Sequence, residues 1–251
     1  MRRPLTAIPA LFLAPFFPGG LACAAPQQDT FTPAQRQEVV KILRQALKDD
    51  PTILGDAIVS LKSKAQEQQR SETASQLDAQ KDALENAPAY AVRGNPHGDV
   101  TIVEFFDPRC GYCKRAIPVI DALLKKDKNI RFVEKIVPVL SDKSVTAARA
   151  IIAAALQGGY EKMKRALMTD NATPTDSYLH DIAQQNGLDA DRLIRDMSRK
   201  EVIAAIQVNL DQARDIDLSG TPTFIFNHKR VVPGYMSESD IMNEVRALRK
   251  K

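Results

Sequence analysis

A stretch that joins an apolar run to two cysteines limits what this chain can fold into more than any other feature. The run Val100–Phe106 is rich in β-branched and aromatic residues, which is typical of a strand buried on both faces of a sheet. Pro108 then ends the strand, because proline has no N–H group for the ladder. Cys110 and Cys113 follow at once, and the apolar spacing after them predicts an amphipathic helix to about Leu124. The stretch therefore predicts a strand–loop–helix unit with two cysteines at the helix start.

The spacing of the two cysteines indicates thiol–disulfide exchange. A thiolate is the nucleophile in this chemistry, and an ordinary cysteine is mostly protonated at neutral pH. At a helix start, unpaired backbone N–H groups and the positive end of the dipole favour the anion of Cys110. Cys113 follows closely enough to attack a mixed disulfide formed at Cys110. We predict that both are catalytic, with the Cys110–Cys113 disulfide as the redox group and no bound cofactor.

Other uses of the two cysteines fit the sequence less well. A structural zinc site needs about four ligands, whereas the histidines of this chain are scattered, at His97, His180 and His228. No metal site is therefore predicted. A purely structural disulfide between the two cysteines would close a very short loop, so it would remove little conformational entropy from the unfolded chain. Two unrelated core cysteines are a further alternative, which the flanking strand and helix disfavour.

The N-terminus is typical of a leader for export. Two arginines follow Met1, a mostly apolar stretch comes next, and Ala22-Cys23-Ala24 matches a small-x-small cleavage site. We expect residues 1–24 to be a signal peptide and the mature protein to be periplasmic, with lipidation of Cys23 as the alternative. The formal charge of +4 falls to about +2 without the leader, which gives no support to nucleic-acid binding.

Two helical segments are expected before the cysteines. Residues 25–61 contain helix-start signals at Thr32 and at Asp50-Pro51, each followed by an apolar stripe. The two short helices expected within residues 25–61 would bury these stripes poorly by themselves. They are therefore expected either to dock on the catalytic domain or to mediate self-association. Residues 62–88 are mostly polar and predict an exposed helical linker.

The rest of the chain, residues 89–251, predicts an α/β catalytic domain. Residues 130–137 predict another strand, and a helical region extends from about 142 to 215. Residues 223–232 predict a hairpin, which is followed by a last helix from Ser237. This order resembles a thioredoxin-like fold with an inserted helical domain.

Further site residues are expected around the cysteines. Glu104 is the only charged residue in the buried strand, and we predict that it accepts or supplies the proton of Cys113. The alternative is a pleat position that reaches solvent. Tyr112, between the cysteines, is expected to contact substrate. Pro222 precedes the hairpin, where on its own it would simply end a loop.

Together these residues resemble the DsbA-like branch of the thioredoxin superfamily. The resemblance rests on Glu104 six residues before Cys110, on the inserted helices and on Thr221-Pro222, and it covers residues 89–251. It implies a cis bond before Pro222 that faces the cysteines. Such a bond would leave the backbone of Thr221 free to pair with an extended substrate segment.

After the leader, the whole chain also resembles the suppressor-of-copper-sensitivity C (ScsC) family. That resemblance implies that residues 25–61 form an oligomerisation segment, as in trimeric family members, and that residues 62–88 form a mobile linker. It further implies a membrane thiol reductase as partner and misfolded or reduced exported proteins as clients.

The dipeptide between the cysteines and the threonine before the proline resemble those of periplasmic disulfide isomerases. The resulting prediction is a periplasmic thiol–disulfide oxidoreductase, an isomerase or reductase. One alternative is a DsbA-like dithiol oxidase. The other is a copper-tolerance protein that binds Cu(I) on the two thiolates, because soft sulfur ligands select Cu(I).

Overall fold

This computed structural model describes residues 31–250, so the expected signal peptide and Cys23 lie outside the described residues. The chain divides into two compact units, with the boundary between Lys62 and Ser63. Within residues 31–250, no helix is long and apolar enough to cross a membrane.

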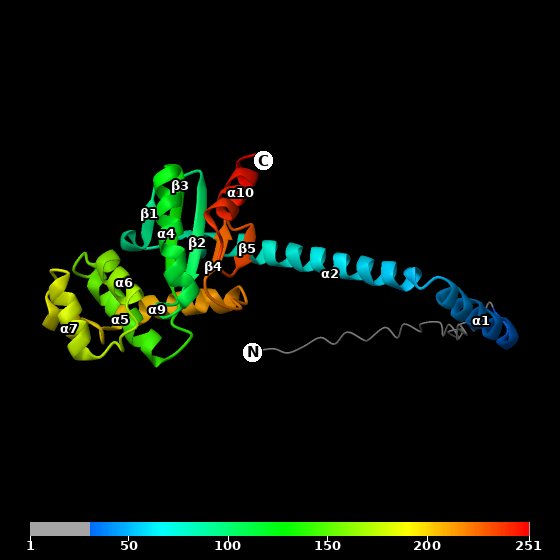
Figure 1. Ribbon diagram of the computed structural model, residues 1–251, viewed down its shortest axis with the longest axis horizontal. Helices are drawn as coiled ribbons and strands as arrows, with labels where there is room; N and C mark the ends of the chain where they lie inside the picture. The colour runs from blue at the N-terminus through cyan, green and yellow to red at the C-terminus, as the bar shows by residue number, and fades with distance from the viewer. Residues whose placement is uncertain (1–30, 251) are drawn as a thin grey trace, which may run out of the picture. The chain divides into compact units, whose positions relative to one another are not determined.

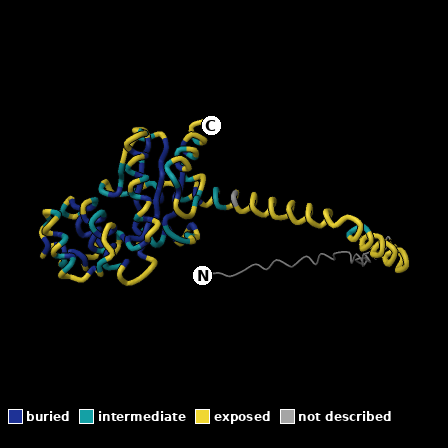
Figure 2. Tube along the Cα trace, viewed as in Figure 1, coloured by how far each residue is buried: buried dark blue, intermediate teal, exposed yellow. Residues whose placement is uncertain are grey.

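The N-terminal unit consists of α1 (Pro33–Asp49) and the first part of α2 (Thr52–Ala79). The predicted start of α1 is observed as a capping box, in which Thr32 and Gln35 each accept a hydrogen bond from the other's backbone N–H. None of the residues of α1 is buried (Figure 2). Large apolar side chains are exposed on the two helices and just before them: Phe31, Val39, Val40, Ile42, Leu43, Ile53, Leu54, Ile58, Val59 and Leu61.

The polar stretch expected as a linker differs from the expectation in two respects. The helix α2 continues through the expected boundary after Leu61, and its second part belongs to the C-terminal unit. Leu77 in α2 and Leu84 in α3 (Lys81–Glu85) are fully buried, at 0% exposed. Both pack in a cluster with Phe105 and Ile225 of the sheet. The two leucines of this polar stretch therefore contribute to the core of the C-terminal unit.

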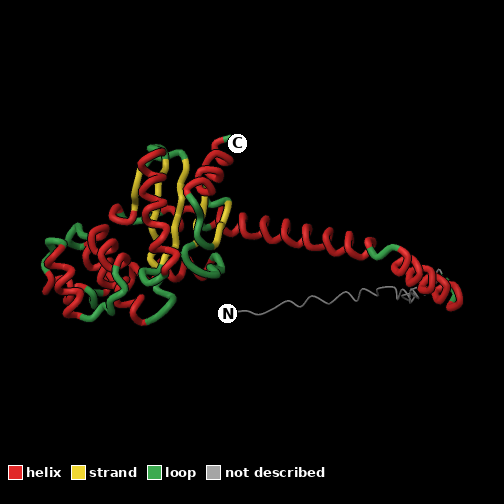
Figure 3. Tube along the Cα trace, in the orientation of Figure 1, coloured by secondary structure: helices red, strands yellow, loops and turns green. Residues whose placement is uncertain are grey.

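A five-stranded mixed sheet forms the centre of the C-terminal unit (Figures 1 and 3). Its order is β1-β3-β2-β4-β5, in which β2 and β3 are parallel and the other neighbours are antiparallel. The central strand β2 is buried along its whole length, as its apolar run predicts. The strands are β1 (Val92–Gly94), β2 (Val100–Phe106), β3 (Ile130–Ile136), β4 (Thr223–Phe226) and β5 (Arg230–Pro233).

Helices cover both faces of the sheet. On one face, α4 (Gly111–Lys126) and α10 (Glu238–Arg249) pack on alternate residues of β2, such as Ile102. Val103 faces the other side, toward α2 and α3. A 3-10 turn, η1 (Ala89–Ala91), precedes β1. The helical insertion packs against the end of the sheet that carries the cysteines and comprises α5 (Asp142–Ala155), α6 (Tyr160–Thr169), α7 (Asp176–Gln185), α8 (Ala190–Asp196) and α9 (Lys200–Asp215). A thioredoxin-like fold with a helical insertion is thereby observed, as predicted.

Candidate active site

The two cysteines lie where β2 gives way to α4. Cys110 is the N-cap of α4, and its sulfur accepts a hydrogen bond from the backbone N–H of Cys113 at 3.4 Å. Its own backbone N–H donates to the carbonyl of Asp107, which holds the short connection after the strand. Both cysteines are free thiols here, 6% and 1% exposed respectively. The position predicted for the attacking sulfur, at a helix start, is the one observed.

The surroundings separate the acidities of the two thiols. The pKa of Cys110 is lowered to about 5, and the largest cause is the hydrogen bond from the Cys113 thiol. Burial opposes this, while Thr221 and the backbone N–H groups of Cys113 and Tyr112 lower the pKa of Cys110 further. The pKa of Cys113 is raised by burial, by its hydrogen bond to Cys110 and by the charge of Glu104. At neutral pH the outer sulfur is therefore a thiolate and the inner one a thiol. The sequence predicted that the helix start would lower the pKa of Cys110. It did not predict the larger contribution, which comes from the hydrogen bond of the Cys113 thiol.

The loop before β4 reaches the same sulfur. The Thr221–Pro222 bond is cis, and the backbone oxygen of Thr221 lies 3.3 Å from the sulfur of Cys110. On the other side of the loop, the backbone N–H of Gly234 donates to the oxygen of Pro222 at 2.7 Å. The structure thus brings Thr221 and Pro222 to the cysteine pair across more than 100 residues of sequence.

Glu104 is buried, at 4% exposed, and does not reach solvent. It lines a small cavity together with Cys113, on the face of β2 that α4 covers. Burial raises the pKa of Glu104 to about 8, the neighbouring Glu134 raises it as well, and Lys164 and Arg93 oppose the rise. A protonatable carboxyl therefore lies beside the buried thiol, where the sequence predicted it.

A buried ion-pair network behind Glu104 was not predicted. Glu134 is the register partner of Glu104 on the parallel strand β3. Lys164 on α6, 2% exposed, donates to both carboxylate oxygens of Glu134 at 2.6 and 2.8 Å and pairs with Glu161 at 2.6 Å. Arg93 on β1 also pairs with Glu134, at 3.3 Å. Glu134 is the only acidic residue in the predicted strand 130–137, which could have drawn attention to it. Nothing local in the sequence indicates that Lys164 is its partner.

A second unpredicted residue, Asp107, organises the loops around the cysteines. Its side chain is fully buried and accepts hydrogen bonds from the backbone N–H groups of Arg109 at 2.7 Å, Val139 at 2.9 Å and Leu140 at 3.0 Å. The loop that follows β3 is thereby fixed beside the start of α4. No local signal in the sequence indicated this role of Asp107, which directly follows the strand and precedes Pro108.

Tyr112 is 57% exposed between the two cysteines, so its side chain is available to a substrate.

The three histidines lie apart from one another, and His228 forms a hydrogen bond with Glu85, not with a residue of the cysteine site. Across residues 31–250, no cluster of three or more His, Cys, Asp or Glu side chains is placed to hold a metal ion.

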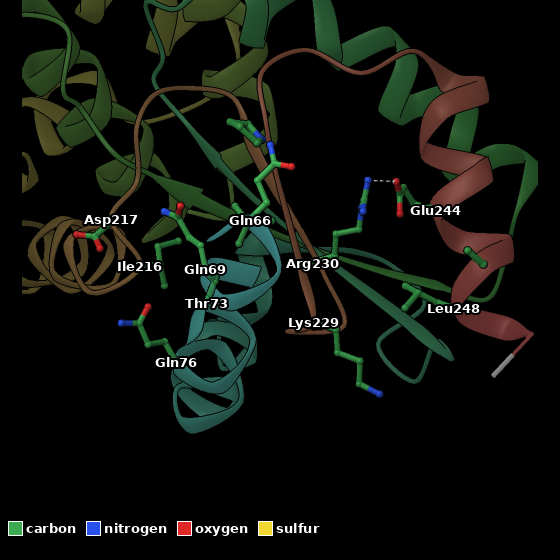
Figure 4. A pocket seen from close by; sticks show the side chains of 13 residues that line it. Gln66, Gln69, Thr73, Gln76, Ile216, Asp217, Lys229, Arg230, Glu244 and Leu248 are labelled. Carbon is green, nitrogen blue, oxygen red and sulfur yellow. Dashed lines mark ion pairs between the residues drawn. The ribbon is translucent and has the colours of Figure 1, made fainter. Parts of the chain in front are cut away.

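A separate hollow of about 660 Å³ lies away from the predicted site residues, between α2, the β4–β5 hairpin and α10 (Figure 4). Side-chain amides of α2, among them Gln66 and Gln69, line one side of it. Arg230 on β5 and Glu244 on α10 form an ion pair at 2.9 Å on the other side. None of the predicted site residues lines this hollow.

The fold and the paired thiols define a thioredoxin-like thiol–disulfide oxidoreductase. The family model described as "DSBA-like thioredoxin domain" matches residues 101–245, more than half of the chain. The protein therefore belongs to the DSBA-like thioredoxin domain family.

Solved structures agree with this assignment. A thioredoxin-like oxidoreductase from Silicibacter pomeroyi is 40% identical, with a TM-score of 0.63 over 68% of this chain and 98% of the other. ScsC of Proteus mirabilis, in a transitional conformation, is 22% identical with a TM-score of 0.63, over 88% of this chain and 99% of that chain, and shares the fold. A curated relative, Na(+)/H(+) antiporter NhaA 1 of Salinispora arenicola, is 32% identical over 150 residues, 59% of this chain. The match spans only 23% of that antiporter's length.

Proposed function

We propose that this protein is a periplasmic protein disulfide isomerase or reductase in which Cys110 attacks and Cys113 resolves. The observation that carries the proposal is the opposite shift of the two thiols, with the pKa of Cys110 lowered to about 5 and that of Cys113 raised. A nucleophile that is already ionised needs no base for its attack. A resolving thiol that stays protonated does not close the disulfide prematurely.

In the proposed reaction, the Cys110 thiolate attacks one sulfur of a client disulfide. The client S–S bond breaks, the mixed disulfide forms, and the other client sulfur leaves as a thiolate. In isomerisation, another client thiolate attacks the client sulfur of the mixed disulfide, so that a new S–S bond forms within the client and Cys110 leaves again as a thiolate. In reduction, Cys113 loses its proton and displaces the client sulfur from Cys110. The client then gains two electrons and the protein becomes the Cys110–Cys113 disulfide.

Glu104 is proposed to take the proton of Cys113 in the resolving step. The negative charge of the Cys110 thiolate is one of the causes that raise the pKa of Glu104. Forming the mixed disulfide removes that charge, so the pKa of Glu104 falls when a base is needed. The ionised carboxylate that acts as the base therefore becomes more populated after a client has been bound.

Thr221 and Tyr112 are proposed to bind the client. The Thr221 backbone lies beside the Cys110 sulfur, which suits pairing with an extended segment next to the client cysteine. The exposed apolar side chains of α1 and the start of α2 support self-association of the N-terminal unit, because large apolar patches on a protein surface usually mark interaction sites. A membrane thiol reductase is the proposed partner that returns the pair to its reduced form.

A DsbA-like oxidase is the second candidate, and the same low pKa of Cys110 favours it, because a stabilised thiolate makes the disulfide form more oxidising. Refolding of scrambled ribonuclease tests isomerisation, and disulfide formation in reduced ribonuclease tests oxidation. We expect activity of the mature protein with scrambled ribonuclease and its loss in Cys110→Ser. Activity with reduced ribonuclease alone would assign the oxidase function instead. Titration of the reduced protein with Cu(I), compared with Cys110→Ser, tests the copper-binding alternative.

A further inference from the structure

The surface beside Cys110 carries an exposed cation that no acidic side chain neutralises. Arg115 lies in the second turn of α4, and its guanidinium carbon lies 4.1 Å from the centre of the Tyr112 ring. Nothing within residues 31–250 forms a hydrogen bond or an ion pair with this guanidinium, apart from its contact with the ring. Arg115 is exposed, so the N–H groups of its guanidinium are accessible to a ligand.

The other two cations near the cysteines are already engaged. Arg109 donates to the backbone oxygens of Asn171 at 2.8 Å and Ala172 at 3.0 Å. Lys114 donates to the backbone oxygen of Asp170 at 2.9 Å and to the side-chain oxygen of Asn171 at 2.7 Å. Both side chains therefore hold the α6–α7 loop against the start of α4 and are not available to a client. Their positive charges still add to the potential around Arg115.

Few acidic groups oppose this positive charge. Asp107 is buried and its carboxylate is satisfied by backbone N–H groups. Asp170 accepts a hydrogen bond from the hydroxyl of Tyr178 at 2.7 Å and is also attracted to Lys114, so its exposed carboxylate offsets part of the positive charge. The cations of Arg109, Lys114 and Arg115 thus exceed the exposed carboxylates next to the nucleophile.

We propose that Arg115, stacked on Tyr112, binds a carboxylate that flanks the reacting cysteine of the client, so that the protein prefers disulfides with acidic neighbours. The inference rests on the proposed function, because it assumes that a client disulfide is attacked at Cys110. An acidic client would otherwise be repelled by the Cys110 thiolate itself. A guanidinium held by an aromatic ring loses little further freedom on binding and offers a planar pair of donors that matches a carboxylate.

The test uses peptides of equal length that carry one cysteine as a mixed disulfide with 2-mercaptoethanol. The neighbours of the cysteine are Glu, Gln or Lys. One turnover of the reduced full-length mature protein converts each peptide disulfide to two thiols and the Cys110–Cys113 dithiol to its disulfide, so electrons balance. The second-order rate constant of this single turnover is measured by quenched mass spectrometry over a range of salt concentrations.

We expect the Glu peptide to react about two- to fivefold faster than the Gln peptide at low salt, the range of an exposed ion pair, and the Lys peptide to react more slowly. The preference should decline toward one as salt screens the charges. In Arg115→Gln the ratio of the Glu to the Gln rate constant should fall to about one.

Lys125→Gln is the matched control. It removes the same charge from an exposed position of the same helix, ten residues and about 15 Å from Arg115, beyond the screening length of about 8 Å at physiological salt. The ratio should keep its wild-type value in this variant. An unchanged ratio in Arg115→Gln, or an equal fall in Lys125→Gln, would overturn the inference. A wild-type protein that fails to reduce even the Gln peptide would instead contradict the proposed function, so the two failures are distinguishable.

Discussion

Replacing Glu104 with glutamine should stabilise the reduced protein and slow the resolving step. The pKa of Glu104 is raised from 4.5 to about 8, first by burial and then by Glu134. Between pH 4.5 and pH 7 the unfolded carboxyl loses its proton while the folded one keeps it. At about 1.4 kcal/mol per pH unit, this lowers the free energy of unfolding by about 3 kcal/mol at pH 7. Glutamine does not titrate and avoids that cost.

The difference in the free energy of unfolding between Glu104→Gln and the wild-type protein should increase with pH, in favour of the variant. A carboxyl whose folded pKa is raised supports the fold fully below the unfolded value of 4.5, and this support is lost as pH rises to about 8. Denaturant unfolding of the two reduced proteins should therefore give nearly equal free energies at about pH 4. The gain in Glu104→Gln should reach about 3 kcal/mol at pH 7 and level off at about 5 kcal/mol above pH 8.

The same substitution should slow catalysis. Glutamine cannot accept the proton of Cys113, and general base catalysis contributes about 10²- to 10⁴-fold. Single-turnover kinetics should show normal formation of the mixed disulfide and a resolving step slower by about two orders of magnitude. Oxidation to the Cys110–Cys113 disulfide should reduce the stability gain, because the thiolate that helps to raise the pKa of Glu104 is then absent.

Glu134→Gln is the control, because Glu134 is the register partner of Glu104 but forms an ion pair with the buried Lys164. Removing Glu134 leaves the buried Lys164 with only the partly exposed Glu161 as its partner, so this variant should lose up to about 3–5 kcal/mol. The two substitutions are chemically identical, yet they should change stability in opposite directions. If Glu104→Gln leaves stability at pH 7 unchanged, or if its gain does not depend on pH, the assigned protonation is wrong.

Three other outcomes are expected. Cys113→Ala should raise the pKa of Cys110 from about 5, because the Cys113 thiol is the largest cause of its lowering, and the ultraviolet absorbance of the thiolate measures this. Leu77→Ala should destabilise the C-terminal unit by about 2–5 kcal/mol in urea unfolding, since Leu77 is fully buried, whereas Leu61→Ala, at a 68% exposed position, should not. Deletion of residues 25–61 should lower the mass found by light scattering from that of an oligomer to that of a monomer, because it removes the exposed apolar stripes.

The features predicted from sequence are those with local signals. The apolar run of β2, the proline after it and the cysteine spacing all lie within one short stretch, and the structure has the strand and helix where these signals place them. The capping pair of Thr32 and Gln35 is equally local. Pro222 was placed at the site through family resemblance, since nothing near it in sequence indicates that it lies beside Cys110.

The features that were missed depend on contacts between distant segments. Lys164 lies 30 residues from Glu134, and Arg93 lies 41 residues from it, so no periodicity joins them. Leu77 and Leu84 occur in a polar stretch whose composition predicts an exposed helix. They are buried only because the sheet offers them an apolar face made of residues far along the chain. A sequence pattern shows which side chains can be buried but not which surface will cover them.

The helical insertion decides which of two adjacent buried carboxyls carries the exchangeable proton. Glu104 and Glu134 occupy matching positions on neighbouring strands, and both are 4% exposed. Lys164 comes from α6 of the insertion and holds Glu134 in a buried ion pair through two short hydrogen bonds. Among residues 31–250, no lysine donates a hydrogen bond to Glu104, which lies in the cavity with Cys113, where its pKa rises to about 8. The insertion therefore acts on Glu104 through Glu134, whose charge raises the pKa of the carboxyl beside Cys113, while the charge of Lys164 itself opposes that rise.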